Sequence, residues 1–232
     1  MRDCKTPRTN FLSSACRSLV RPAIVCMLIL ALHGCNYFIM AGYLIGGPPS
    51  NEPDFDAITR KSMTDFGVTV AVVCDAPVEL KWDNNKIDKE LAKYVSRKMA
   101  GKKIIVIDCD QVYAWMDKHP HRDRPTEIGA YFNTTYVVYI DLKKYSLFEE
   151  SSPNLRRGRA EALVTVYEMD GDGDGARIYS KDVVSKYPLR APQAASDVRY
   201  STFRRLYLTR LSEEVGRLFY EWYNGDDIVD AT

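Results

Sequence analysis

Two aspartates on either side of a cysteine, Asp108-Cys109-Asp110, form the stretch of the sequence best suited to chemistry. They follow the apolar residues 104–107 (IIVI), so they are expected at the carboxyl end of a buried strand. A second acidic group, GDDIVD, occupies residues 225–230. Carboxylates brought together can hold Mg²⁺ while one of them attacks a phosphoryl group. We favour a structural interpretation instead, in which the first pair caps a helix and the second group lies in a charged tail.

The two acidic groups resemble the motifs of the haloacid-dehalogenase-type phosphatases. That resemblance implies a magnesium-dependent phosphatase acting through Asp108 and Asp110. The chain departs from the pattern after the first motif, because Gln111-Val112 lacks the threonine-type residue of that family. Gly225 also follows a predicted helix, whereas the chemistry needs both motifs at strand ends. Phosphatase activity is therefore the alternative, and a protein that is not an enzyme is the main prediction.

Cys74 and Cys109 are predicted to end two parallel strands at the same edge of a sheet. In an oxidising compartment they would form a disulfide if their geometry allows it, and otherwise they are two buried thiols. The chain has no Cys-x-x-Cys pair, so neither a zinc knuckle nor a thioredoxin-type redox site is indicated.

The sequence predicts no catalytic metal or cofactor. Asp170, Asp172 and Asp174 alternate with glycines as in a calcium loop, but Lys181 stands where such a loop places its glutamate. We interpret this segment as a hairpin turn, with a weak structural calcium site as the alternative. His119 and His121 flank Pro120 in a polar segment, which favours a surface loop over a metal site. No G-x-S-x-G motif of a serine hydrolase is present.

The amino-terminal part has the pattern of an export signal. Five basic residues and one acid precede an apolar run, and residues 22–49 carry no charge. Leu32-His33-Gly34-Cys35 resembles the lipobox of bacterial lipoproteins, although that family prefers a small or apolar residue in place of His33. The resemblance implies cleavage before Cys35 and acylation of Cys35, for which palmitate is the natural label.

Two other interpretations of this segment stay open. Residues 22–47 are long enough to remain as an uncut membrane-spanning anchor, and a soluble secreted form is the third. The lipoprotein interpretation divides the chain into a signal peptide (1–34), a lipid anchor and spacer (35–56), a domain (57–224) and a flexible acidic tail (225–232). The lipoprotein and the uncut anchor both tether the domain to a membrane.

Composition restricts the partners of the exported part. The whole chain has 32 basic and 31 acidic side chains, and without residues 1–34 the counts become 27 and 30. This balance predicts no nucleic-acid partner, since a nucleic-acid-binding domain carries a basic excess. The remaining 198 residues, in a chain with 46% hydrophobic residues, are enough for one folded domain with its own core.

Hydrophobic periodicity predicts a single α/β (α+β) domain. Continuous apolar runs at 67–74 and 103–108 predict buried strands, and residues 87–99 between them have helical spacing. Short helices are expected at 111–118 and 125–132. Long strands are expected at 134–148, 159–169 and 177–187, followed by an amphipathic helix at 200–223. The predicted order is β-α-β-α-α-β-β-β-α, with a mixed sheet of about five strands and helices packed on it.

This order of elements resembles that of a group of envelope domains. The segments that carry the resemblance are VAVV, IIVID, the helix end Glu127-Ile128-Gly129-Ala130 and the strand start Gly158-Arg159-Ala160-Glu161-Ala162. These are typified by the amino-terminal domain of TolB, by the secretion lipoprotein CsgG and by the lipoprotein activators of peptidoglycan synthases. Residues 46–56 (GGPPSNEPDFD) also resemble uncharacterised lipoproteins of planctomycete-type bacteria. The resemblance implies a non-catalytic binding or assembly module on the periplasmic face of a membrane, with an envelope protein as partner. Self-assembly into a homo-oligomeric structural protein is a further alternative.

Overall fold

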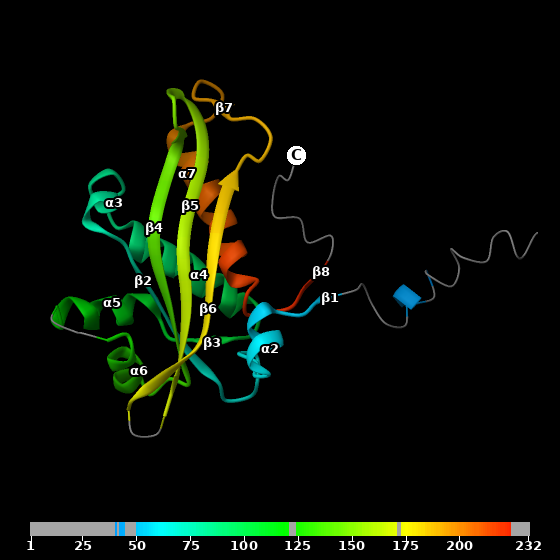
Figure 1. Cartoon of the computed structure of the whole chain (residues 1–232), viewed down its shortest axis with the longest axis vertical. Coiled ribbons are helices and arrows are strands. Elements are labelled where there is room, and N and C mark those ends of the chain that lie inside the picture. The colour runs from blue at the N-terminus through cyan, green and yellow to red at the C-terminus, as the bar shows by residue number, and fades with distance from the viewer. Residues whose placement is uncertain (1–39, 41, 45–49, 121–123, 171–172, 224–232) are drawn as a thin grey trace, which may run out of the picture. The chain divides into compact units, whose positions relative to one another are not determined.

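The computed structural model describes residues 40, 42–44, 50–120, 124–170 and 173–223 (Figure 1). Cys35, His121, Asp172 and residues 225–230 lie outside this part. The chain divides into two units, residues 1–49 and residues 50–232, and the sheet and core belong to the second. Within the described residues, no helix has both the length and the apolar composition needed to cross a membrane.

The second unit is the single mixed α/β domain that the sequence predicts. Its elements are β1 (Ser50–Asn51), α2 (Asp54–Thr59), β2 (Thr69–Asp75), α3 (Val78–Asp83), α4 (Ile87–Gly101), β3 (Ile105–Val106), α5 (Cys109–Lys118), α6 (Thr126–Phe132), β4 (Tyr136–Glu149), β5 (Ser152–Met169), β6 (Gly175–Tyr187), β7 (Gln193–Ala194), α7 (Tyr200–Gly216) and β8 (Trp222–Tyr223). The predicted order from β2 to α7 is confirmed, with the short elements α3 and β7 added.

The main sheet has the strand order β3-β2-β4-β5-β6, and β7 pairs with β5. β2 is parallel to both β3 and β4, whereas β4, β5 and β6 form antiparallel hairpins. The five central residues of β2, from Val70 to Cys74, are buried, as a strand covered on both faces requires. Residues 150–151 alone join β4 to β5, because both strands run further into the predicted connector than expected.

Two helices, α4 and α7, pack against each other and cover one face of the sheet (Figure 1). Phe203 and Tyr207 of α7 are fully buried, and the Phe203 ring stacks near Tyr187 of β6. A Cβ atom at Gly158 of β5 would lie 2.3 Å from the Tyr207 ring. The small residue in β5 is therefore needed for the close approach of α7 to the sheet.

The domain begins earlier than the predicted boundary at residue 57. Ser50 and Asn51 of β1 pair with Tyr223 and Trp222 of β8, so both belong to the folded unit. Phe55 of α2 is fully buried, and its N–H donates to the Leu218 carbonyl at 3.0 Å. Residues 50–56, which composition assigns to a spacer, are thus the first elements of the domain.

The carboxyl-terminal helix is shorter than its apolar spacing predicts. α7 ends at Gly216, and the chain then turns so that Phe219 packs against Phe55, with ring centroids 6.0 Å apart. Trp222 lies in β8 and not on a helix. Phe219 also lies near Tyr179 of β6, so the chain after Gly216 packs on both α2 and the sheet.

Candidate functional site

The aspartates of the Asp108-Cys109-Asp110 motif are held by structural contacts. Asp108 precedes α5, and its Oδ1 accepts a hydrogen bond from the Asp110 N–H at 2.9 Å, as in a helix cap. Asp110 Oδ2 lies 2.6 Å from Lys93 Nζ of α4. The hydrogen bond from Lys93 keeps the pKa of Asp110 below its ordinary value. The motif thus begins α5 and joins it to α4.

Cys74 and Cys109 are both buried and both free in the structure. Cys109 is the first residue of α5, and its Sγ lies 3.9 Å from the Lys89 carbonyl of α4. Cys74 Sγ donates to the carbonyl of its neighbour Asp75. Tyr113 Oη bonds to the N–H and the carbonyl of Cys74, at 3.3 and 2.8 Å. Each thiol therefore has its own backbone acceptor, and this structure has the two buried thiols, the second of the two alternatives, and not the disulfide.

Alkylation of Cys109 is expected to be slow in the folded protein. Burial raises the pKa of this thiol from 9.0 to about 11, so at pH 8 the thiolate population falls roughly 100-fold. Iodoacetamide labelling at pH 8 followed by peptide mass spectrometry measures the rate. The same reaction in denaturant is the control and should proceed at an ordinary rate. Equal rates in both conditions would contradict the prediction, and a peptide containing Cys74 linked to Cys109 would restore the disulfide.

The described parts of the other two motifs have local structural roles. The Asp170 N–H donates to the Asp174 carbonyl at 2.9 Å, closing the turn between β5 and β6. The calcium site stays a prediction, since Asp172 lies outside the described residues. The His119 ring stacks on Trp115, with centroids 4.3 Å apart, and its Nδ1 lies 2.9 Å from the Trp115 carbonyl. In the described part of the chain, no three His, Cys, Asp or Glu side chains converge as metal ligands would.

A surface that the sequence analysis did not identify lies on β4, β5 and β6. The strand register places six side chains in two adjacent rows, and we call this surface the open face: Lys144, Glu161 and Val184 in one row, and Ser146, Arg159 and Lys186 in the other. Residues of the opposite face, such as Tyr145 and Ala160, are buried under α7. Two further described helices contact these strands: α6 packs near Val137 and Met169, and α2 packs on β6 through Phe55 and Tyr179.

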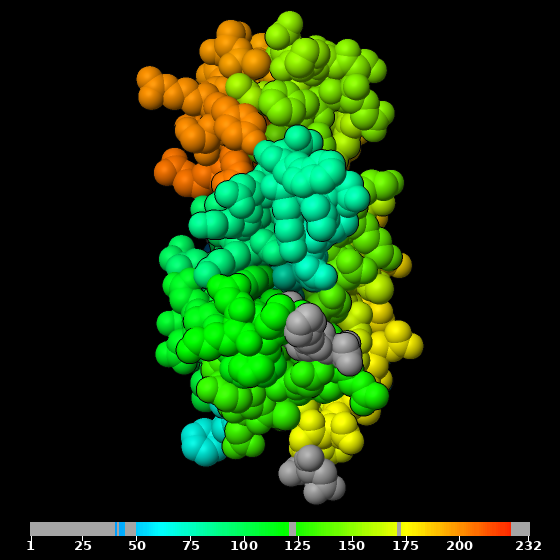
Figure 2. All heavy atoms as spheres, turned by 90° about the vertical axis from the view of Figure 1, so that its left-hand side faces the viewer, coloured from blue at the N-terminus to red at the C-terminus, as the bar shows by residue number. Residues whose placement is uncertain are grey.

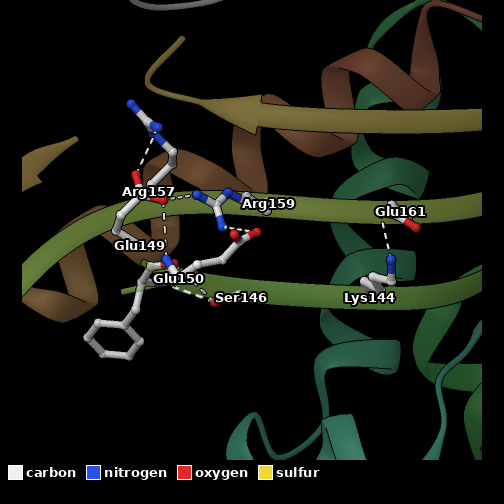
Figure 3. Close-up of polar contacts among 8 residues, drawn as sticks. Lys144, Ser146, Glu149, Glu150, Arg157, Arg159 and Glu161 are labelled. Atoms are coloured by element: carbon white, nitrogen blue, oxygen red, sulfur yellow. Dashed lines mark hydrogen bonds and ion pairs between the residues drawn. The ribbon is translucent and has the colours of Figure 1, made fainter. Parts of the chain in front are cut away.

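An ion-pair network borders the open face where β4 turns into β5 (Figure 3). The Glu149 carboxylate lies between two arginines of β5 and contacts Arg157 Nη1 at 2.8 Å and Arg159 Nη2. Arg159 also contacts Glu150 at 2.6 Å, and Arg157 donates to the Arg190 carbonyl at 3.2 Å. The Arg157 and Glu149 side chains are only 10% and 19% exposed, so this pair is largely shielded from solvent, whereas Glu150 is 81% exposed.

The open face is polar except for the exposed Val184, and three of its four charges are positive, on Lys144, Arg159 and Lys186, with Glu161 negative. Lys144 and Glu161 form an exposed pair at 3.0 Å, visible at the right of Figure 3. A surface of this kind suits a partner with matching polar and charged groups better than an apolar one. The signal in the sequence is the alternation of polar residues with Tyr145 and Ala160 along the two strands.

Comparisons with known proteins give only distant similarities. No family model and no curated protein matches the chain. Similar solved structures include lipoprotein GNA1162 from Neisseria meningitidis, 11% identical, covering 64% of this chain and 98% of that one with a TM-score of 0.41. They also include the PelC dodecamer from Paraburkholderia phytofirmans, which is 10% identical. That match covers 74% of this chain and 96% of that one, with a TM-score of 0.38. A third is the LpoB C-terminal domain from Salmonella enterica, which is 12% identical. That match covers 56% of this chain and 94% of that one, with a TM-score of 0.31.

Proposed function

We propose that the chain is a membrane-anchored lipoprotein of the cell envelope whose domain is a non-catalytic binding or assembly module. A non-catalytic role is supported by the contacts of the two aspartates best suited to chemistry, because both are already held by structural interactions. Asp108 caps α5 and Asp110 pairs with Lys93. The proposal of an anchor rests on the sequence pattern around Cys35. The anchor holds the domain on the periplasmic side of the membrane.

The open face is the surface that we assign to an envelope protein partner. It combines two rows of mostly polar side chains with a backbone fixed by β-ladder hydrogen bonds on β4, β5 and β6. A rigid strand surface loses little conformational entropy on binding, which favours its use as a recognition surface. Its charges, three positive and one negative, favour a partner with the complementary charge pattern.

Palmitate labelling tests the anchor. Cells that express the full chain are expected to incorporate radioactive palmitate into the protein, and the Cys35→Ala variant should incorporate none. Cys26→Ala is the matched control and should label like the parent, since Cys26 belongs to the segment that cleavage before Cys35 removes. Equal labelling of the parent and Cys35→Ala would refute the acylated anchor.

Crosslinking in intact cells tests the binding surface. A photo-crosslinking residue in place of Lys144 is expected to give a defined adduct with another envelope protein. The same residue in place of Lys103, exposed in the turn between α4 and β3, is the control and should give none. A ladder of adducts with further copies of this chain would instead support the self-assembling protein. Magnesium-dependent phosphatase turnover that disappears in Asp108→Asn would support the enzyme and refute the binding module.

A further inference from the structure

β6 is the last strand of the main sheet, and within the described part of the chain it pairs only with β5 (Figure 1). Figure 2 shows these strands from the side, where the yellow-green and yellow atoms of β5 and β6 form the right-hand margin of the domain. A strand edge without a neighbour carries unpaired N–H and C=O groups and can template a further strand. With its 13 residues, β6 is long enough for a strand of another molecule to add to the sheet.

The direction of the backbone groups of β6 follows from the strand pairing. The Met169 N–H of β5 donates at 2.9 Å to the Thr135 carbonyl, on the side of β4. Backbone groups alternate between the two edges of a strand, so the even-numbered residues of β5 bond to β6. Their partners in residues 179–187 of β6 are all odd-numbered. The even-numbered residues 182, 184 and 186 therefore direct their N–H and C=O groups away from the sheet.

A second copy of β6 fits this edge best in one antiparallel register. Pairing with a copy of itself requires a two-fold axis, and an axis at Val184 sets the two Val184 residues opposite each other. Asp182 of each copy then lies opposite Lys186 of the other, which gives two ion pairs by symmetry. An axis at Asp182 or at Lys186 would oppose like charges, and an axis at Val183 or Ser185 would form no ion pair.

The side chains that meet in this register are available for it. Asp182 and Lys186 are exposed, and neither forms an ion pair or a side-chain hydrogen bond with the described residues. Val184 is 77% exposed, so contact with its copy would remove apolar surface from water. The side chains through which β6 bonds to α2 are those of Tyr179 and Lys181, which precede this stretch.

We propose that two copies of the chain pair through β6 in this register and form a closed two-fold dimer with one continuous sheet. The row Lys144, Glu161 and Val184 of one open face then continues into the same row of the other copy. The two open faces become a single symmetric surface. The dimer goes beyond the proposed binding module and does not rest on it.

Charge exchange in the full-length protein, kept in detergent, tests the dimer. Sedimentation velocity is expected to show a dimer with a dissociation constant of about 10 µM or lower. Asp182→Lys opposes two lysines at each end of the pairing, and Lys186→Asp opposes two aspartates. Each single variant should therefore dimerise at least about tenfold more weakly than the parent. Mixing the two variants should restore the dimer, because every lysine again meets an aspartate.

Lys103→Asp is the matched control for Lys186→Asp, since it makes the same change at an exposed lysine outside β6 and should dimerise like the parent. The double exchange Asp182→Lys/Lys186→Asp should also dimerise like the parent, which separates pairing from any effect of one substitution on folding. The proposal is refuted if the parent stays monomeric up to about 200 µM, or if the mixture of single variants does not associate. Single variants that associate as tightly as the parent would place the contact elsewhere and overturn it, as would assemblies larger than a dimer. Neither palmitate labelling nor crosslinking to an envelope protein depends on these results.

Discussion

Replacing Phe55 with alanine is expected to lower the free energy of unfolding of the domain by about 3–5 kcal/mol. Phe55 is fully buried, and its ring meets those of Tyr136, Tyr179 and Phe219 at centroid distances of 5.7, 5.6 and 6.0 Å. Removing it empties the space between α2, the sheet and the chain after α7. Urea unfolding followed by tryptophan fluorescence measures the change.

Phe66 provides the control for Phe55. It is fully exposed, so Phe66→Ala should change the free energy of unfolding by less than about 0.5 kcal/mol. A small loss in Phe55→Ala, comparable to that of Phe66→Ala, would mean that α2 contributes nothing to the stability of the domain. The domain would then begin near residue 57, as composition alone predicts.

Glu149→Gln is expected to lower the free energy of unfolding by about 2–4 kcal/mol. The substitution keeps the size of the side chain but removes the charge that pairs with Arg157, whose side chain is 10% exposed. Arg157 would then lie in a shielded position without its carboxylate, and Arg159 would keep only the exposed Glu150. The breaking of a shielded pair is costly because the remaining charge stays poorly solvated.

Glu161→Gln is the matched comparison on the same strand surface. Its partner Lys144 is 71% exposed, so the loss should be below about 1 kcal/mol. The difference between the two variants, measured by the same urea titration, isolates the effect of burial. Equal losses would show that solvent screens the network at Glu149 as fully as it screens the Lys144–Glu161 pair.

The central part of the fold follows directly from the sequence. The apolar run of β2 and the helical spacing of α4 depend on local pattern, so their positions agree with the predictions to within a few residues. Both ends of the domain depend on long-range contacts. In residues 50–56 the single large apolar residue is Phe55, between two acids, and its partners are Tyr136, Tyr179 and Phe219. A local sequence pattern cannot identify these partners, because they lie far from Phe55 along the chain.

The candidate sites also divide into those that a local sequence pattern indicates and those that depend on long-range contacts. The Asp108-Cys109-Asp110 motif attracts attention because its residues are adjacent, yet the structure uses them to begin a helix. The rows of the open face draw on β4, β5 and β6, three segments that only the folded chain brings together. Alternation along each strand indicates which residues face outward, but the pairing between strands is a property of neighbours in space. Sequence spacing therefore could not identify the rows.

The pairing of β1 with β8 makes the domain a candidate for circular permutation. Ser50 lies opposite Tyr223, so the described part of the second unit starts and finishes at neighbouring positions. A short flexible linker from Tyr223 to Ser50 would therefore close the chain with little strain, and new ends could be opened in the two-residue turn between β4 and β5. A permuted domain would keep α2, the sheet and α7 while presenting its free ends beside the open face. Reporter groups could then be attached next to that surface without changing its side chains.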